Sequence, residues 1–554
     1  MNRFWAKVIM YFVTFSVFCV QGPYLWGQTG TDDNLPLSFG PNQRIYPGSL
    51  NQTEVFIASN PGNPDILWVS CNTLNFVPFF VSEGIYVSTD GGKNWRGSDS
   101  CNGAPIAYHG GDPGITIDQH GTFILTRLGR SPFAGLYSHF SKDNGETFSS
   151  QKVISTDDLE RAALATNTIP GTPGYGRTYA GWIKFAHPFP MMFAHTDDGA
   201  GNWSAPRQLN QPPRRSAGGD IAIGPNGEVY VCWSGVTDIS PFREVQVGFA
   251  ASLNGGVDWI INESAYAMNG INGMLSEKGG IRVNGLPAMA VDVTEGSRKG
   301  WIYVVTGEKG LPPAGADPDI ILHRSVDGGA TWSPGIRVNQ DPTDNGKIQY
   351  FPTIHIDAKG NLYVIYYDDR TTTADSAAVF LARSTDGGDT WKEYEISDRR
   401  FKPVPIGGLG QGYQGDNIDI TSTPTHLWPV WMDNRTGIYQ IWTVPILISQ
   451  LDNVHENPGM ADWQGCHIFP NPASGHFTVE FTVPAPGRVH LSLINPLGQT
   501  LITLIDEYMF PGTYREVVPT ILSSLGHQLL PGICFCRFQT GKYKIGRASC
   551  RERV

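Results

Sequence analysis

Charged residues are scarce in this chain, and basic residues form no run. Only 16% of the 554 residues are charged, and 40 Lys and Arg stand against 51 Asp and Glu, which gives a net charge of -11. A nucleic acid or an anionic membrane surface is bound by clustered Lys and Arg. The composition therefore argues against nucleic acid and anionic membranes as partners.

Cysteine is scarce as well, with eight residues and no CxxC pair. The sequence also lacks a Ser-His-Asp signature, the ligand spacing of a zinc site and a phosphate-binding loop. We therefore predict no cofactor. The acidic balance is compatible with calcium but does not indicate it.

Long apolar runs are absent except at the amino terminus. There Arg3 and Lys7 precede the run "VIMYFVTFSVFCV", and small-residue sites follow near Gly22 and Gly27. The run is too short to span a bilayer comfortably. We predict a secretory signal peptide over residues 1–27, with an uncleaved anchor as the alternative, and hence export of the mature chain.

What the chain has in abundance is turn residues, with 65 Gly and 40 Pro, and a repeated motif. The form Ser-x-Asp-x-Gly-x-x-Trp recurs six times, most loosely at "TDDGAGNW", and apolar alternation on both sides predicts that it is the turn of a β-hairpin. The Asp or Asn should accept backbone N–H bonds and the aromatic ring should be buried, while one carboxylate per turn is too few for calcium. The structural residues of the six turns are Asp90, Asp143, Asp198, Asn254, Asp327 and Asp386.

This motif is the Asp-box, or bacterial neuraminidase repeat, and residues 40–447 resemble the sialidase superfamily of β-propellers. The resemblance implies an all-β fold. Seven apolar segments, starting near residues 54, 112, 161, 219, 286, 351 and 415, predict inner strands. They favour seven blades, the last closed by the amino-terminal segment "LSFGPNQRIY", with the six blades of catalytic sialidases as the alternative.

The composition changes after residue 447. Residues 448–465 are predicted to be a linker, and residues 466–544 show short alternating strands typical of a small Ig-like β-sandwich. The last ten residues, 545–554, are similar to the translation of a sequencing adapter, so we predict that they are an artefact and that the domain is truncated.

Residues 466–544 resemble the carboxy-terminal sorting domain of type IX secretion substrates in Bacteroidota. The matching residues are Pro470, Asn471 and Pro472, then Asn495, Gly498 and Gln499, and finally Gly532. Cys534 stands where that family usually has Tyr. The resemblance implies the type IX secretion machinery as a partner, passage through the periplasm, and a final place outside the cell or on the outer-membrane surface; an ordinary Ig-like module is the alternative.

The sialidase resemblance also implies a set of catalytic residues: three arginines that clamp a carboxylate, a Tyr nucleophile paired with a Glu, and an Asp as general acid. The first arginine of the family lies in a Phe-Arg-Ile-Pro motif. Here "QRIYP" matches it only at Arg44 and Ile45.

Two further arginines end equivalent predicted strands, in "YYDDR" and "WMDNR". Equivalent strand ends on adjacent blades open on one face, so Arg370 and Arg435 could form one charged cluster with Asp368, Asp369 and Asp433. Such a cluster would suit an acidic group and proton transfer. The alternative, which we favour, is that each Asp pairs with its neighbouring Arg and ties blade to blade.

Acidic residues also stand at the starts of predicted inner strands, at Glu54, Asp112 and Asp416, and Tyr413 is close to the last of them in sequence. They could meet the arginines at the channel mouth or only cap backbone N–H groups. The catalytic candidates are therefore Arg370, Arg435, Asp369, Asp433, Tyr413 and Arg44.

Fold does not establish chemistry, so two functions stay open. The first is a secreted or cell-surface propeller that binds a glycan or glycoprotein without turnover, which we favour because the sialidase signature is incomplete. The alternative is an exo-α-sialidase-like glycoside hydrolase that acts outside the cell.

Overall fold

The structure is a computed structural model, and it describes residues 39–101, 109–240, 242–271, 273–408, 410–452, 466–474, 476–483, 486–494, 500–519, 521–522, 527–528, 533–540 and 543–551. The chain divides into two compact units, Leu37–His455 and Glu456–Val554. Helices are almost absent from these described residues, and the prediction of an all-β fold is confirmed.

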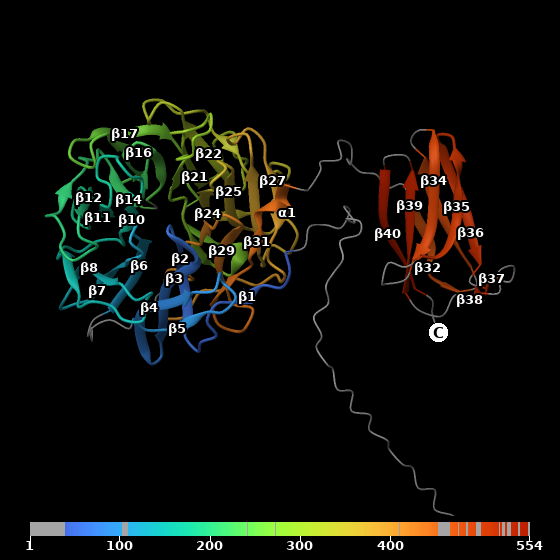
Figure 1. Cartoon of the computed structure of the whole chain (residues 1–554), viewed down its shortest axis with the longest axis horizontal. Coiled ribbons are helices and arrows are strands. Elements are labelled where there is room, and N and C mark those ends of the chain that lie inside the picture. Colours follow the sequence, from blue (N-terminus) through green and yellow to red (C-terminus); the bar gives the residue numbers. More distant parts are fainter. Residues whose placement is uncertain are drawn as a thin grey trace, which may run out of the picture. The chain divides into compact units, whose positions relative to one another are not determined.

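The larger unit is built from antiparallel sheets in which consecutive strands pair (Figure 1). Three of these sheets come from the first half of the unit: β2 (Asn51–Asn60), β3 (Asn63–Phe76), β4 (Phe79–Ser88) and β5 (Arg96–Ser98); β6 (His109–Ile117), β7 (Phe123–Gly129), β8 (Gly135–Ser141) and β9 (Lys152–Ser155); and β10 (Ala163–Thr166), β11 (Thr178–Ile183), β12 (Met191–Thr196) and β13 (Arg207–Gln208).

Three more sheets follow the same order: β14 (Arg215–Ile223), β15 (Val229–Val236), β16 (Glu244–Ser252) and β17 (Ile260–Ala267); β20 (Ala288–Val291), β21 (Ile302–Glu308), β22 (Asp319–Ser325) and β23 (Ile336–Arg337); and β24 (Gln349–Ile356), β25 (Leu362–Asp368), β26 (Ala378–Ser384) and β27 (Lys392–Glu395). A ribbon of β18 (Gly273–Leu275) and β19 (Ile281–Val283), joined by the 3-10 helix η1 (Ser276–Lys278), precedes β20.

A further sheet joins the two ends of the unit. It contains β28 (Asp419–Ser422), β29 (His426–Asp433), β30 (Gln440–Thr443) and the short β31 (Ile446–Leu447), and its outer strand is β1 (Gln43–Arg44). In this pairing Arg44 lies opposite Trp442. The amino-terminal segment therefore covers a sheet edge that would otherwise be exposed.

The first strand of each sheet lies toward the middle of the unit, where Figure 1 places β2, β6, β10, β14 and β24. Four of these inner strands carry a β-bulge near the same end, at residues 53–56, 111–114, 217–220 and 350–353. Glu54 and Asp112 sit in two of these bulges with φ of 54° and 55°. A bulge turns its side chain out of the regular alternation, which places these two carboxylates differently from their strand neighbours.

The six Asp-box turns share one set of contacts. In the first, Asn94 donates its backbone N–H to Asp90 Oδ1 at 3.0 Å, and Gly92 donates to Ser88 Oγ at 2.8 Å. Thr331 and Gly329 repeat this pattern around Asp327 and Ser325. The equivalent turns lie at Asp143, Asp198, Asn254 and Asp386.

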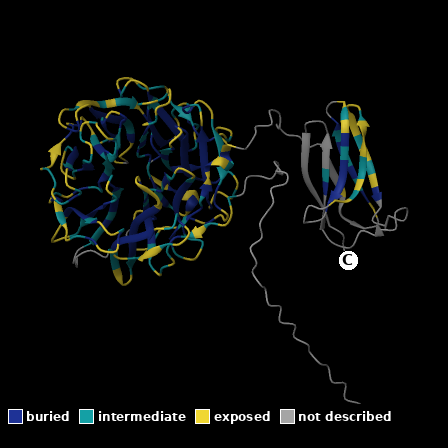
Figure 2. Cartoon of the chain, in the orientation of Figure 1, coloured by how far each residue is buried: buried dark blue, intermediate teal, exposed yellow. Residues whose placement is uncertain are grey.

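Large aromatic side chains fill the sheets, and buried residues follow the strands (Figure 2). Trp68, Trp182, Trp233 and Trp431 are among the largest fully buried side chains. Burying such a ring contributes about 2–3 kcal/mol. These rings belong to the core and are not available to stack on a ligand.

The unit continues past the predicted boundary at residue 447. Ile448–Asp452 forms the helix α1, in which Ile448 and Leu451 are buried. Arg383 donates to the carbonyl of Leu451 at 2.6 Å, and Lys359 pairs with Asp452 at 3.1 Å. The first five residues of the predicted linker therefore pack on the propeller, through two buried apolar side chains and through polar contacts with Arg383 and Lys359. Residues 453–465 lie outside the described residues.

The smaller unit contains two main sheets. One is formed by β32 (Cys466–Ser474), β33 (His476–Val483) and β36 (Gly512–Pro519), and the other by β35 (Thr500–Met509), β34 (Gly487–Ile494), β39 (Ile533–Thr540) and β40 (Tyr543–Arg551); β37 (Ile521–Leu522) pairs with β38 (His527–Gln528). Apolar residues of β33 and β34, such as Phe477, Val479 and Leu491, form its core.

Parts of the predicted sorting motif lie in this unit. Pro470, Asn471 and Pro472 belong to β32, and Cys534 belongs to β39. Asn495, Gly498, Gln499, Gly532 and the signal segment 1–27 lie outside the described residues. Strand β40 includes most of residues 545–554 and pairs with β39. The pairing does not test whether these residues come from a sequencing adapter, so that origin stays a prediction. In the described ranges no helix has the length and apolarity to cross a membrane.

Candidate functional site

A cavity of about 420 Å³ lies at the centre of the propeller. The inner strand of each sheet contributes to its lining. One example from each sheet is Ser59, Ile115, Leu164, Asp220, Ala288, Thr353 and Asp419. The volume lies within the range of about 300–1,000 Å³ that is typical of ligand sites. The cavity is therefore the main candidate for a binding site.

Two carboxylates in the cavity wall hold neighbouring sheets together. Asp220 accepts N–H bonds from Ile221 and, across the sheet boundary, from Met289, each at 2.8 Å. Asp419 accepts from Ile420 at 2.8 Å and from Ile57 at 3.0 Å in the same manner. Burial raises the pKa of Asp220 to about 6 and that of Asp419 to about 7. Their contacts give both residues a structural role.

One end of the cavity gathers ionisable side chains around Tyr413. Glu54, Glu160, Arg161 and Asp416 line this end. The Tyr413 hydroxyl hydrogen-bonds Thr53 Oγ1 at 2.9 Å and accepts a bond from Asn72 Nδ2 at 3.3 Å.

The same Asn72 amide also reaches Asp112. Its Nδ2 donates to Asp112 Oδ1 at 3.0 Å, and its oxygen accepts the backbone N–H of Asp112 at 2.5 Å. Four of the residues here, Glu54, Glu160, Arg161 and Asp416, line the cavity, whereas Asp112, Arg282 and Tyr413 do not line it but interact with those four. We call these seven residues the charged end of the cavity.

The carboxyl groups of the charged end are poorly solvated. Burial raises the pKa of Glu54 well above its usual value, and the nearby charges of Asp112 and Asp416 raise it further, while a hydrogen bond from Tyr413 opposes the shift. Burial, with the charge of Asp112 second, raises the pKa of Glu160 to about 7. Burial also raises the pKa of Asp112. Raised carboxyl pKa values of this kind are common in functional sites.

Two arginines belong to the charged end. Arg282 forms an ion pair with Asp416, with Nε 3.3 Å from Oδ1, and its guanidinium lies 5.6 Å from the centre of the Tyr413 ring. Arg161 lies over the Phe56 ring at 4.7 Å. Within the described residues Arg161 has no ion pair with a carboxylate. Its N–H groups therefore stay available to a ligand.

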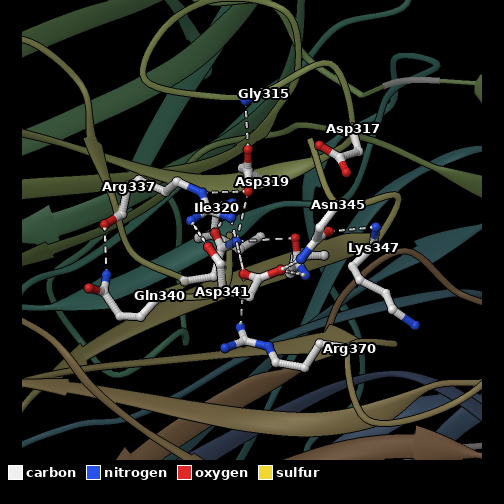
Figure 3. Close-up of polar contacts among 12 residues, drawn as sticks. Gly315, Asp317, Asp319, Ile320, Arg337, Gln340, Asp341, Asn345, Lys347 and Arg370 are labelled. Carbon is white, nitrogen blue, oxygen red and sulfur yellow. Dashed lines mark hydrogen bonds and ion pairs between the residues drawn. The ribbon is translucent and has the colours of Figure 1, made fainter. Parts of the chain in front are cut away.

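The predicted cluster of Arg370 and Arg435 is divided by the structure into separate networks. Arg370 pairs with Asp368 at 2.6 Å and with Glu393 at 2.6 Å. Figure 3 shows that it also faces Asp341, at 3.5 Å, which in turn pairs with Arg337. The guanidinium of Arg370 therefore contacts carboxylates of β25, of β27 and of the segment after β23, and these contacts link the three elements.

Arg435 has its own partners. It pairs with Asp433 at 2.7 Å and with Asp398, and it lies over the Trp442 ring at 4.3 Å. Asp369 forms a third group, because it pairs with Lys278 at 2.7 Å with both side chains fully buried. The contacts of Asp368 and Asp433 agree with the favoured interpretation, because each pairs with its neighbouring arginine, Arg370 or Arg435. Asp369 differs, because its cation is Lys278.

The other two predicted residues lie apart from each other. Arg44 is half-buried in β1, opposite Trp442. Tyr413 contacts Glu54 at the charged end of the cavity. The lining of the cavity includes neither Arg44 nor Arg370, Arg435, Asp369 or Asp433.

Sequence reasoning missed Glu160, Arg161 and Arg282. Glu160 and Arg161 stand at the start of the apolar segment predicted near residue 161, as Glu54 and Asp112 stand at the starts of theirs, and this equivalent position was the signal that could have found them. In the structure β10 begins only at Ala163, and Glu54 and Asp112 are the fourth residues of β2 and β6. Arg282 lies in the β18–β19 ribbon, outside the repeat, so no pattern pointed to it. In the part of the chain that the structure describes, no group of three or more His, Cys, Asp or Glu residues is arranged to hold a metal ion.

Comparison with known protein families gives one match. The family model described as BNR/Asp-box repeat matches residues 86–96, which include the turn at Asp90. The chain thus carries a BNR repeat. This repeat and the sheet order agree with a propeller of the BNR type. No curated protein matches the chain.

Several solved structures are similar to the chain at low identity. A protein of unknown function from Dyadobacter fermentans DSM 18053 is 14% identical with a TM-score of 0.43, covering 74% of this chain and 98% of its own. A PL25 ulvan lyase is 11% identical with a TM-score of 0.48, covering 74% and 99%. The Hadza microbial sialidase Hz136 is 14% identical with a TM-score of 0.39, covering 70% and 75%. Similarity at this level carries no information about activity.

Proposed function

We propose that this protein is a glycan-directed β-propeller that binds a saccharide at the charged end of its central cavity. The observation that carries the proposal is the convergence of carboxyl, hydroxyl and guanidinium groups from separate sheets on one cavity of about 420 Å³. Such groups hydrogen-bond sugar hydroxyls in fixed directions, and a cavity of this size accommodates one or two sugar rings.

The state of Tyr413 favours binding over hydrolysis. A tyrosine nucleophile needs a neighbouring base that withdraws its proton. Here burial, and then the charge of Glu54, raise the pKa of Tyr413 well above its usual value. Glu54 also has a raised pKa, because it is buried and lies near the charges of Asp112 and Asp416. The raised pKa of Tyr413 opposes the loss of its proton, which favours hydrogen bonding over attack on a sugar.

The supply of arginines agrees with binding as well. Arg370 and Arg435 are held by ion pairs outside the cavity lining, and Arg282 is paired with Asp416. Arg161 alone among these four has no carboxylate partner within the described ranges. A clamp of three arginines for a sialic acid carboxylate is not supported by these contacts.

A glycoside hydrolase is the second candidate. Tyr413 hydrogen-bonds Glu54, and the nearby carboxyl group of Glu160 has a pKa of about 7. A tyrosine paired with a glutamate, together with a carboxyl group that can donate a proton, could also cleave a glycosidic bond. In this case Glu160 would donate the proton. Release of sugar from any glycan by the wild-type protein, lost in Tyr413→Phe and in Glu160→Gln, would establish the second candidate and reject binding without turnover.

A glycan array with the purified full chain tests the proposal. We expect binding to a defined set of saccharides, weakened about tenfold in Arg161→Gln because a charge-assisted hydrogen bond is lost. The matched control is Arg207→Gln, an exposed arginine of β13 that does not line the cavity. Absence of binding to every saccharide, or equal weakening in the control, would reject the proposal.

We further propose that the chain works outside the cell or on the outer-membrane surface. The charged and apolar pattern of residues 1–27 and the sorting-domain resemblance of residues 466–544 support export by the type IX machinery. Cell fractionation and amino-terminal sequencing of the mature protein test it, and a chain retained in the cytoplasm with residues 1–27 intact would reject it.

A further inference from the structure

The loops beside the charged end of the cavity carry a surface of paired arginine and phenylalanine side chains. Arg215 begins β14, and its guanidinium lies between two rings, 4.1 Å from the centre of Phe189 and 4.6 Å from that of Phe242. Phe189 belongs to the β11–β12 loop and Phe242 to the β15–β16 loop. We call Phe189, Arg214, Arg215, Phe242 and Arg243 the Arg–Phe surface.

Backbone contacts place this surface at the same sheet end as the cavity mouth. The N–H of Glu160, at the charged end, donates to the carbonyl of Ile183, where the β11–β12 loop begins. Ser216 donates to the carbonyl of Phe189 at 3.2 Å, and Arg215 lies opposite Val236, the last residue of β15. A chain-like ligand that leaves the cavity at this end would therefore meet the Arg–Phe surface.

The charge of the surface is opposite to that of the whole chain, whose net charge is -11. Among the described residues, Arg214, Arg215 and Arg243 take part in no ion pair. The β15–β16 loop carries one exposed carboxylate, Asp238. Beside the β11–β12 loop, Asp158 is exposed and Lys184 is paired with Asp157 at 2.8 Å, so these charges leave the three arginines in excess. The surface therefore presents an excess of positive charge.

The geometry of Arg215 favours an anion with several oxygens. Contact with two rings restricts the positions that the Arg215 guanidinium can take, and within the described residues it forms no ion pair with a carboxylate. A fixed guanidinium binds the oxygens of a sulfate or carboxylate with little loss of rotamer entropy. The Phe242 ring is 42% exposed and adds apolar surface beside Arg215.

We propose that the Arg–Phe surface binds the anionic groups of an acidic polysaccharide, one that carries sulfate or carboxylate substituents. The proposal rests on the proposed function in taking a glycan as the ligand. It extends that function from one or two sugars in the cavity to a polymer that continues over the β11–β12 and β15–β16 loops.

Fluorescent dextran sulfate and unsubstituted dextran of equal chain length form a matched pair of probes for the full chain. We expect dextran sulfate to bind and dextran not to bind, with affinity that falls as salt increases. Arg214→Gln and Arg215→Gln should each weaken binding about tenfold. Arg214 is exposed, so its variant tests the surface even if Arg215→Gln perturbs the loops.

Arg207→Gln is the control, because Arg207 is equally exposed but lies on β13 at the outer edge of a sheet. Equal binding of the two dextrans, or an Arg214→Gln affinity equal to that of Arg207→Gln, would overturn the proposal. So would equally tight binding of a DNA duplex, since it would reveal a generic site for polyanions.

The cavity variant separates this proposal from the proposed function. Arg161→Gln should leave dextran sulfate affinity within about twofold, because the two sites use different arginines. Loss of dextran sulfate binding in Arg161→Gln alone would overturn the Arg–Phe surface. If no saccharide on the glycan array binds but dextran sulfate still binds in an Arg214-dependent manner, only the proposal of a saccharide site in the cavity would be rejected.

Discussion

Replacing Lys278 by Met should destabilise the propeller by about 3–5 kcal/mol, because it leaves the carboxylate of Asp369 buried without its counter-charge. Lys278 and Asp369 are both fully buried, and their N–O distance is 2.7 Å. Met has a similar length and fills the space of the lysine stem without a polar atom. The substitution therefore removes the charge with little change in packing.

The contacts of Lys278 set the magnitude. Its ammonium has three N–H groups, and these donate to Asp369 Oδ2 at 2.7 Å, to the Ala374 carbonyl at 3.0 Å and to the Ser376 carbonyl at 2.9 Å. Each buried acceptor left without a donor costs about 1–3 kcal/mol. Asp369 keeps one bond, from the Ile348 N–H at 2.8 Å, which limits the total loss.

Chemical denaturation followed by tryptophan fluorescence measures the effect. Lys278→Met combined with Asp369→Leu should cost less than the sum of the two single variants, because both charges are then removed together. A loss below about 1 kcal/mol in Lys278→Met, or additive losses in the double variant, would refute a structural role for the buried Lys278–Asp369 pair.

Two further predictions concern the turns and the cavity. Gly329→Ala should lower the free energy of unfolding several times more than Gly346→Ala. Both glycines have positive φ, 90° and 73°, but only at Gly329 would the new Cβ lie 2.0 Å from the Phe249 ring. Equal losses of stability in thermal unfolding would contradict the role of the Asp-box turn. The free energy of unfolding should fall as pH rises from 5 to 8. The pKa values of Glu160 and Asp419 are raised to about 7 in the folded state, so the folded state holds protons that the unfolded chain has lost. The pH dependence should be smaller in Asp419→Asn, and a stability that rises over this range would contradict the raised pKa values.

The fold could be predicted because its decisive contacts are local. An Asp-box turn closes within five residues, as when Asp90 accepts from Asn94, so the letters of the motif are enough to specify the hairpin. The alternation before and after each turn then predicts the strands that pair. Alternation could not predict the packing of α1, because it is held by residues distant in sequence, Arg383 of β26 and Lys359 of the β24–β25 turn.

The site was harder to predict because its residues come together through bulges. Glu54 and Asp112 adopt positive φ, which alternation does not reveal. The "DDR" pattern allowed two interpretations, and the favoured one, local pairing, holds for Asp368 and Arg370. Arg370 donates to Asp368, two residues away, at 2.7 Å, so the charges that stand out in the sequence neutralise each other locally.

A crystal structure of the protein with the saccharide that binds most tightly on the array tests the central claim most directly. We predict sugar density in the central cavity, with oxygens within about 3.5 Å of Arg161 and Glu160. Density at the strand ends that carry Arg370 and Arg435, with an empty cavity, would contradict the claim.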